Sequence, residues 1–298
     1  MTTDHRQRAP SGRVSYVNGR YLPHAQACVH IEDRGMQFAD SVYEVCAVLD
    51  GRLIDEQGHG ERLGRSLAAL NMPLPMNTPA LGIVMREVVR RNRLRNGLVY
   101  LQVTRGAYRR DHVMPQNPRL SVIITARGID VGAVEKRRAE GIAVITLPDL
   151  RWGRCDIKTT GLLANVMAKT EARKRGAFEA WFVDREGMIT EGSSTNAWIV
   201  SSDGVLLTRH LSQNILAGVT RAGVLTALKA KTGNRVEERP FSVEQALAAR
   251  EAFITSASGG VLPVVSIDGK KIGTGAPGPI AQKIHRLYSG LTGVAGGE

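Results

Sequence analysis

The stretch WGRCDIKTTGLLANVMAKTEARKRGA, residues 152–177, places Lys158 between two different kinds of local structure. Lys158 follows an extended-looking run and precedes a helix-like segment whose apolar residues Leu162, Leu163, Val166 and Met167 fall on one face. An amine at such a junction can attack an aldehyde if desolvation or neighbouring positive charge lowers its pKa. Most lysines are solvated surface charges, so the junction alone leaves both interpretations open.

Outward from this junction, the sequence indicates two α+β units with mixed, hairpin-rich sheets. Asn18-Gly19 and Asp50-Gly51 each separate two short apolar runs, which predicts tight hairpin turns. Helical spacing appears in both halves, for example over residues 59–70, 78–92 and from Thr220 onward. The pattern is not the regular alternation of a doubly wound fold.

A domain boundary is expected where the periodic pattern lapses. Residues 128–135 have no clear period and are interpreted as a linker. We therefore expect a smaller N-terminal α/β domain over residues 1–127. A larger C-terminal domain is expected over residues 136–298, and it would contain Lys158.

Composition bounds the class of protein. The 298 residues are 43% hydrophobic and 23% charged, as in globular proteins. The apolar runs are far shorter than the ~18 residues of a membrane span, and the first residues lack the apolar core of a signal peptide. The three cysteines, Cys28, Cys46 and Cys155, are widely spaced without a Cys-x-x-Cys pair. We therefore expect neither disulfides nor a metal site, and a location in the reducing cytoplasm.

The basic charge leaves an alternative from another class of protein. A formal net charge of +12 is compatible with nucleic-acid binding. The densest basic run, residues 86–96, contains no aromatic side chain on which bases could stack. This run is more typical of a solvated helix face, and a basic protein equally attracts small phosphates and carboxylates.

Two further stretches are suited to binding a cofactor. In TEGSSTNAW, residues 190–198, Glu191 precedes a glycine and a cluster of small hydroxyls, which predicts a tight polar loop. In NILAGVTRAGVL, residues 214–225, Val219 and Thr220 begin a helix whose N-terminus could bind phosphate. An ordinary turn and a simple threonine cap remain the alternatives at these two places.

A fourth stretch is suited to binding a carboxylate. In VTRGAYRRDHVMP, residues 103–115, Arg110 and His112 are two residues apart. In an extended segment they would point to the same side, where an arginine fork beside a histidine could hold a carboxylate. A solvated loop is the alternative.

Six short motifs together resemble one family, the fold-type-IV pyridoxal-phosphate aminotransferases. In the order of the chain, they are SVYEV, HGERL, RCDIKT, TEGSSTN, LAGVTR and FITSAS. The resemblance extends over residues 17–263, and a set of six in this order is specific where a single motif is not. Arg110, His112 and Tyr43 resemble the D-amino-acid aminotransferase branch of that family.

The resemblance implies a role for each matching residue. Lys158 would form the internal imine with pyridoxal 5′-phosphate and later move the α-proton of the substrate. Glu191 would pair with the pyridinium nitrogen of the cofactor. The remaining cofactor contacts implied are Arg62, Val219, Thr220, Ser256 and Ala257 at the phosphate, and Leu216 at the ring. The residues implied for the substrate carboxylate are Tyr43, Arg110 and His112.

The family also implies an architecture and an activity. It has two α/β domains with the cofactor between them, and it forms homodimers in which the partner subunit contributes to the substrate site. The implied activity is transamination between D-amino acids and 2-oxo acids such as 2-oxoglutarate or pyruvate. A branched-chain L-amino-acid or (R)-amine transaminase is the alternative within the family, and the preferred side chain stays open. Ala257 departs from the family pattern, in which a hydroxyl is common.

Overall fold

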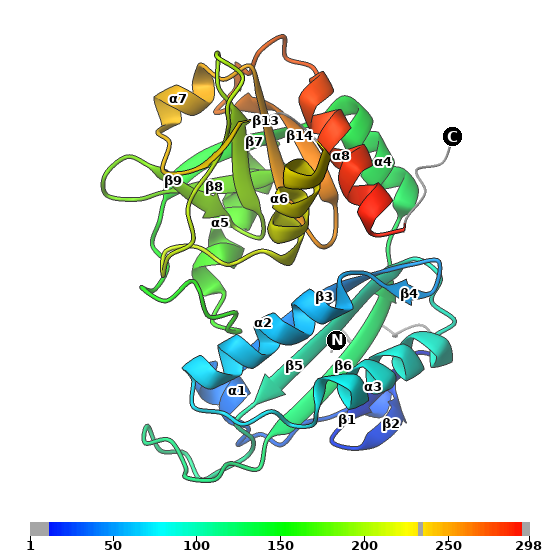
Figure 1. Cartoon of the computed structure of the whole chain (residues 1–298). Coiled ribbons are helices and arrows are strands. Elements are labelled where there is room, and N and C mark those ends of the chain that lie inside the picture. The colour runs from blue at the N-terminus through cyan, green and yellow to red at the C-terminus, as the bar shows by residue number, and fades with distance from the viewer. Residues whose placement is uncertain (1–11, 232–234, 294–298) are drawn as a thin grey trace, which may run out of the picture. The chain divides into compact units, whose positions relative to one another are not determined.

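The computed structural model describes residues 12–231 and 235–293, and the chain divides into two compact units (Figure 1). The first unit comprises Met1–Ile129 and Lys158–Gly161, and the second comprises Asp130–Ile157 and Leu162–Glu298. The predicted domain boundary therefore needs one correction, because Lys158 belongs to the first unit. The reason is a set of backbone contacts between this segment and the first sheet, which no local pattern reveals.

The first unit is built on a six-stranded antiparallel sheet with the order β2-β1-β6-β5-β3-β4. Its strands are β1 (Val14–Val17), β2 (Arg20–Pro23), β3 (Ser41–Leu49), β4 (Arg52–Leu53), β5 (Gly97–Thr104) and β6 (Ser121–Gly128). The predicted hairpins are confirmed: Asn18-Gly19 and Asp50-Gly51 adopt positive φ angles, as two-residue turns require.

Helices cover one face of this sheet. They are α2 (Glu56–Ala69) and α3 (Thr78–Arg91), while the short α1 (Arg34–Phe38) and the 3₁₀ turn His24–Gln26 lie in the connection to β3. The Asn77 side chain caps α3 at Ala80 N, and Pro79 lies in its first turn, where a missing N–H costs nothing. Apolar residues on the inner faces of these helices, such as Leu63, Leu67 and Val88, are buried in the core of the unit.

The second unit contains a nine-stranded mixed sheet with the path β12-β11-β10-β13-β14-β7-β8-β9, and β15 pairs with β14. Its strands are β7 (Ile142–Pro148), β8 (Glu179–Val183), β9 (Ile189–Gly192), β10 (Asn196–Val200), β11 (Leu206–Thr208), β12 (Val236–Glu238), β13 (Glu251–Ser256), β14 (Gly260–Ile267) and β15 (Lys270–Lys271). Parallel pairs involve β7 with β8 and with β14, and β11 with β12, whereas hairpin neighbours are antiparallel. The predicted mixed, hairpin-rich architecture is therefore confirmed.

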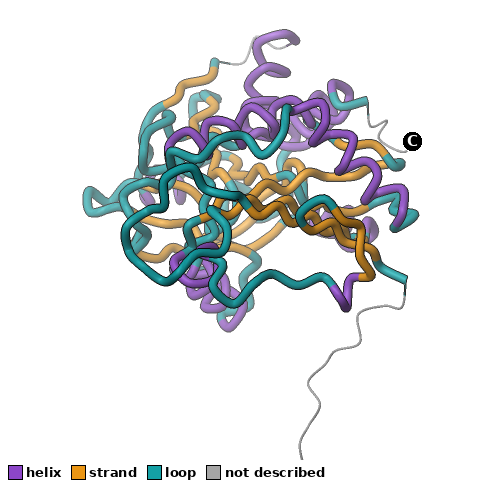
Figure 2. Tube along the Cα trace, turned by 90° about the horizontal axis from the view of Figure 1, so that it is seen from below, coloured by secondary structure: helices purple, strands orange, loops and turns teal. Residues whose placement is uncertain are grey.

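The helices of the second unit are α4 (Val131–Glu140), α5 (Leu163–Lys174), α6 (Val219–Lys231), α7 (Val243–Leu247) and α8 (Pro279–Leu291). One core cluster contains Trp181 and Phe241, and a second contains Trp198 stacked on Phe253 beneath α6 and α8. Long loops, teal in Figure 2, connect several elements, and those over residues 105–120 and 149–162 contain predicted site residues.

One prediction about local structure was wrong, and the buried face of one predicted helix is not its apolar face. Residues 128–135 are not a linker: β6 ends at Gly128, and α4 begins at Val131 with Asp130 capping Ala133 N. The helix has no buried residue, so it lacks the apolar period that would predict it. In α5 the large apolar residues Leu163, Val166 and Met167 are exposed, and the small Ala168 and Ala172 are packed instead.

Among residues 12–231 and 235–293, no helix has the length and apolar character that crossing a membrane requires. The same ranges contain no cluster of three or more histidine, cysteine or acidic side chains suited to a metal ion.

Candidate active site

Lys158 is held in place by its backbone. Its carbonyl accepts a hydrogen bond from Tyr43 N at 2.9 Å, and its N–H donates to Ser66 Oγ at 3.3 Å. The next residue, Thr159, forms an isolated antiparallel bridge with Val42. The lysine is therefore half-buried against the edge of β3 and is not a freely solvated surface charge.

Tyr43 lies beside the Lys158 amine, and Tyr100 stacks on Tyr43. The Nζ atom is 4.2 Å from the centroid of the Tyr43 ring, an arrangement that favours a cation over the ring face. Tyr43 stacks on Tyr100, with the ring centroids 5.6 Å apart. Burial, and secondarily Tyr43, raises the pKa of Tyr100 to about 12, and its hydroxyl donates to Gln102 Oε1. Sequence reasoning missed Tyr100 and Gln102, although their period-two spacing on β5 is a signal for one shared face.

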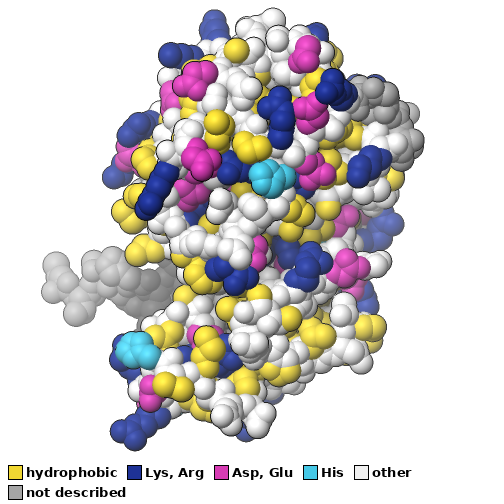
Figure 3. All heavy atoms as spheres, turned by 60° about the vertical axis from the view of Figure 1, so that its left-hand side comes forward, with side chains coloured by type: hydrophobic (Ala, Val, Ile, Leu, Met, Phe, Trp, Pro, Cys, Tyr) yellow, Lys and Arg dark blue, Asp and Glu magenta, His cyan; other side chains and the backbone are white. Residues whose placement is uncertain are grey.

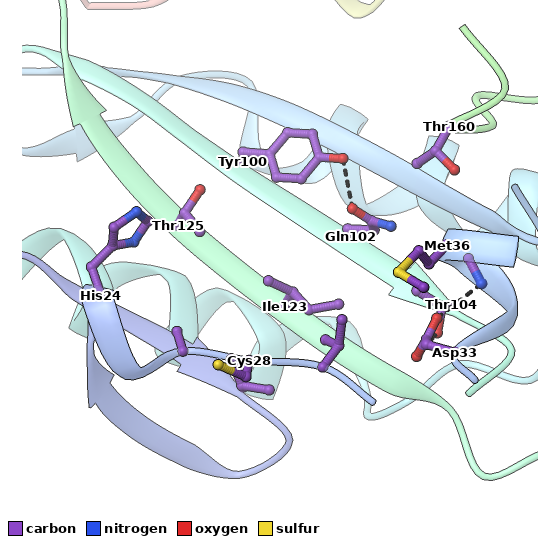
Figure 4. A pocket seen from close by; sticks show the side chains of 14 residues that line it. His24, Cys28, Asp33, Met36, Tyr100, Gln102, Thr104, Ile123, Thr125 and Thr160 are labelled. Atoms are coloured by element: carbon purple, nitrogen blue, oxygen red, sulfur yellow. Dashed lines mark hydrogen bonds between the residues drawn. The ribbon is translucent and has the colours of Figure 1, made fainter. Parts of the chain in front are cut away.

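A cavity of about 350 Å³ lies in the first unit next to these residues (Figure 4). Tyr100, Gln102 and Thr160 contribute to its lining, together with residues of the connection before β3, including Met36. Figure 4 shows the Tyr100 hydroxyl directed at Gln102. Since Thr160 is two residues after Lys158, the cavity adjoins the lysine segment.

Arg62 is oriented by a buried glutamate. Its Nε and Nη2 atoms donate to the two oxygens of Glu44 at 2.8 and 2.7 Å, and His59 Nδ1 lies 2.7 Å from the same carboxylate. Burial works to raise the pKa of Glu44, but hydrogen bonds from Arg62 and His59 prevail and lower it to about 2. Sequence reasoning missed Glu44; its signal is an acidic residue on the apolar face of a strand.

In the second unit, Glu191 on β9 accepts several donors. Leu216 N lies 3.1 Å from each carboxylate oxygen, Asn196 Nδ2 is 3.0 Å from Oε2, and Arg151 Nη1 is 2.5 Å from Oε1. The structure thus brings together Glu191 and Leu216, which the sequence predicted separately. It adds Arg151 and Asn196, which local sequence patterns do not connect to Glu191.

Asn196 links the segment before α6 to Glu191, because its side chain bonds to both. Asn196 Nδ2 also donates to Leu216 O at 3.0 Å. A Cβ at Gly218 would lie 1.9 Å from Asn196 Oδ1, so this close approach requires glycine. Val219 and the buried Thr220 follow as the first residues of the helix, where backbone N–H groups have no partner in the preceding turn. Such a helix start is suited to bind phosphate.

Ser256 and Ala257 lie at the turn between β13 and β14. Ser256 Oγ accepts a hydrogen bond from Gly259 N at 3.2 Å and is 3.5 Å from the Ser258 hydroxyl. The hydroxyl of Ser256 therefore stabilises its own turn, and Ala257 offers only backbone groups.

Arg110 and His112 lie together in the exposed loop between β5 and β6. The Arg110 guanidinium is 5.0 Å from the ring centroid of Phe38, and the His112 ring is 5.4 Å from it. Arg34 orients the loop by donating to Asp111 O at 2.5 Å. These contacts group Arg110 and His112 with Phe38, whereas Tyr43 contacts Tyr100 and Lys158.

The donor set fits pyridoxal phosphate. The amine of Lys158 suits an aldehyde, the carboxylate of Glu191 suits a pyridinium nitrogen, and the helix start at Val219 suits a phosphate. The close packing of Gly218 on Asn196 is consistent with this fit, because it places the helix start next to Glu191.

Known proteins resemble this chain over most of its length. The model of the family described as Amino-transferase class IV matches residues 41–267. The D-alanine aminotransferase of Bacillus licheniformis is 40% identical over 268 residues, covering 90% of this chain and 93% of that protein. The D-alanine aminotransferase of Listeria monocytogenes (strain F2365) is 38% identical over 273 residues, covering 91% of this chain and 93% of that protein.

Solved structures resemble it as well. The branched-chain amino acid aminotransferase of Escherichia coli has a TM-score of 0.87 and 25% identity, covering 96% of this chain and 97% of that chain. The branched-chain aminotransferase of Thermoproteus uzoniensis with norvaline has a TM-score of 0.83 and 27% identity, covering 95% of each chain.

Proposed function

Since the chain belongs to the class IV aminotransferases and is therefore a pyridoxal-phosphate enzyme, we propose that it transfers amino groups between D-amino acids and 2-oxo acids such as 2-oxoglutarate and pyruvate. The observation that supports this best is the fixed position of Lys158 between the Ser66 and Tyr43 contacts. The similarity to D-alanine aminotransferases supports the choice of D-amino acids.

Lys158 is the catalytic residue of the proposal. When bound, pyridoxal phosphate supplies an aldehyde that takes up the amino group and a ring that accepts electrons. The Lys158 amine would hold this aldehyde and, once displaced by the substrate, remove and return the substrate α-proton at Nζ. The Tyr43 ring, whose centroid is 4.2 Å from Nζ, lies beside this amine.

Glu191 and the start of α6 would hold the rest of the cofactor. The carboxylate of Glu191 would keep the ring nitrogen protonated, and Leu216, whose N–H already bonds to Glu191, would pack against the ring. Val219 and Thr220 would donate to the phosphate, while Ala257 would add a backbone N–H and Ser256 its position in the turn. Arg62, oriented by Glu44, would add the positive charge.

Tyr43, Arg110 and His112 would bind the substrate carboxylate. Because Arg110 and His112 lie in an exposed loop, we propose that they act on the site of a second subunit. Apolar side chains around their loop support a homodimer: Ile31, Met36, Val113 and Met114 are exposed. Hydrophobic side chains also reach the surface between charged ones on the face drawn in Figure 3. The enzyme is proposed to act in the cytoplasm.

Transamination of branched-chain L-amino acids is the second candidate. The fold similarity to branched-chain aminotransferases favours it. The Arg110–His112 loop favours the D-amino-acid activity, because this pair resembles the carboxylate-binding residues of the D-amino-acid aminotransferase branch.

One assay separates the two candidates. Purified protein, loaded with pyridoxal phosphate, is given D-alanine or L-alanine with 2-oxoglutarate, and pyruvate formation is followed. We expect turnover with D-alanine and at least a hundredfold lower efficiency with L-alanine. L-Leucine with 2-oxoglutarate is the control for the branched-chain activity. Preference for L-leucine over D-alanine would refute the D-amino-acid assignment while leaving the aminotransferase class intact.

A further inference from the structure

Two buried charged side chains, Arg151 and Asp149, form a chain of ion pairs with Glu191. Arg151 binds Asp149 in a bidentate fashion, with Nε 2.9 Å from Oδ1 and Nη2 2.7 Å from Oδ2. Its third nitrogen, Nη1, donates to Glu191 Oε1 at 2.5 Å. At most 13% of any of these side chains is exposed.

The chain is anchored to the sheet of the second unit. Asp149 follows the end of β7, and its N–H donates to Val183 O at 2.8 Å. Asp149 Oδ2 also accepts from Thr190 Oγ1 at 2.8 Å, immediately before Glu191 in the sequence. The Arg151 guanidinium stacks over Phe182, 4.5 Å from the ring centroid, and donates to Asn214 O at 3.2 Å. Arg151 therefore has one available geometry.

The contacts of Arg151 and Asp149 favour the charged form of each. Burial opposes the charged form of Arg151, but Asp149 and Glu191 outweigh it and raise the pKa of the guanidinium. Burial likewise opposes ionisation of Asp149, whose pKa is nevertheless lowered by Arg151 and Thr190. The neighbouring thiol of Cys155 is neutral, because burial raises its pKa to about 11. With Glu191 as a carboxylate, the three side chains together have one net negative charge.

We propose that Asp149 and Arg151 are positioning residues for Glu191. Arg151 sets the orientation of the Glu191 carboxylate, and Asp149 sets the net charge of the group. This inference rests on the proposed function, in which Glu191 faces the ring nitrogen of the cofactor. Arg151 holds the carboxylate in one orientation, but alone it would neutralise it. Asp149 restores the negative charge, so that the nitrogen still meets a net anion and stays protonated.

Two variants separate charge from geometry. Asp149→Asn keeps the size of the side chain and removes its charge, leaving Arg151 and Glu191 as a neutral pair. Arg151→Lys keeps the charge and loses the planar fork that binds two carboxylates at once. The matched control is Asp156→Asn, because Asp156 forms the same bidentate pair with Arg154 in this loop, at 2.9 Å for both bonds, but at a more exposed place.

The measurement is the protonation of the cofactor nitrogen in the holoenzyme, read from the ¹⁵N chemical shift of ¹⁵N-labelled pyridoxal phosphate against pH. Asp149→Asn should lower the protonation midpoint by about one pH unit or more, a tenfold change in that equilibrium. Arg151→Lys should leave the midpoint in place and slow the half-reaction with D-alanine roughly ten- to a hundredfold, as expected for loss of a charge-assisted hydrogen bond. Asp156→Asn should change neither.

Two results are decisive against these ideas. If Asp149→Asn and Arg151→Lys both behave like Asp156→Asn, the positioning proposal is wrong. If the nitrogen of the unmodified enzyme is already unprotonated, the proposed role of Glu191 itself fails. The affinity of each apoprotein for pyridoxal phosphate and its thermal unfolding midpoint, measured in parallel, show that the variants fold; a folded Asp149→Asn with an unshifted midpoint counts against the proposal.

Discussion

The backbone hydrogen bonds of Lys158 hold this lysine at one position, so its role as the amine that binds the cofactor can be tested directly. Reduction of the holoenzyme with borohydride should attach the cofactor to Lys158, and peptide mapping should locate the label there. Lys158→Ala should lose transamination entirely, because the variant lacks the amine that binds the aldehyde and moves the proton. Lys174→Ala, in the exposed last turn of α5, is the control and should retain activity. A label on another lysine in the unmodified enzyme would refute the assignment.

Arg110 makes a second prediction at this scale, because it would bind a group that every substrate shares. Loss of a bidentate arginine from a carboxylate costs about 1.5–3 kcal/mol, or roughly 10- to 150-fold in affinity. Arg110→Ala should therefore raise KM for D-alanine and for 2-oxoglutarate together and leave the cofactor spectrum unchanged. If KM for both substrates stays at the parental value in Arg110→Ala and in His112→Ala, the carboxylate is bound elsewhere.

At the scale of elements, the contact between α6 and β10 depends on Gly218. A methyl group at this position would lie 1.9 Å from Asn196 Oδ1, and Asn196 Nδ2 donates to Glu191. Gly218→Ala should displace Asn196 and weaken binding of pyridoxal phosphate at least about tenfold, the cost of one charge-assisted hydrogen bond. Gly290→Ala is the control, because nothing lies near that position in α8. Equal cofactor affinity in both variants would show that the helix start does not depend on this packing.

The pairing of β3 with α2 makes a prediction about pH. The pKa of Glu44 falls from an ordinary value of 4.5 to about 2 in the folded protein. A depressed carboxyl pKa contributes stability that is present above pH 4.5 and is lost as the pH falls toward 2, on the order of 3 kcal/mol in all. The free energy of unfolding of the parent should therefore exceed that of Glu44→Gln at pH 6, and the gap should narrow below pH 4.5.

The control for Glu44 is Glu56, a partly exposed glutamate at the start of α2, the helix that contains Arg62. Glu56 pairs with Arg86, whose side chain is half exposed, so Glu56→Gln should change stability little at any pH. Urea unfolding of the three proteins between pH 6 and pH 3 measures both effects. A constant gap between the parent and Glu44→Gln over this range would mean that the charge of Glu44 contributes nothing.

For the whole molecule, the decisive question is which subunit supplies Arg110. If the partner supplies it, a mixed dimer of Lys158→Ala and Arg110→Ala has one site with both residues intact. Unfolding and refolding an equal mixture should then restore roughly a quarter of the parental activity at low substrate, because half of the randomly formed dimers are mixed. Each variant refolded alone is the control. A mixture no more active than its components would place Arg110 and Lys158 of one chain in the same site, or show that the protein is not a dimer.

Much of this protein is readable along the chain, because the informative patterns are short. Turn residues such as Asn18-Gly19 specify their hairpins through positive φ angles, which few other residues tolerate. The six motifs, among them those around Lys158 and Glu191, together identify the family, since each is a local run of residues. Helices with a wide apolar face, such as α2 and α3, were predicted for the same reason, whereas α4 lacks such a face and was missed.

Long-range contacts could not be read in this way. Glu44 and Arg62 are 18 positions apart in the sequence, and Arg151 and Glu191 are 40 apart. The folding of the chain, not the local sequence, brings these residues into contact. The same holds for Lys158, which a bridge to β3 places in the first unit. A buried charge is tolerated only where folding places a partner of opposite charge beside it. The residues that orient a site are therefore identified only from the tertiary structure.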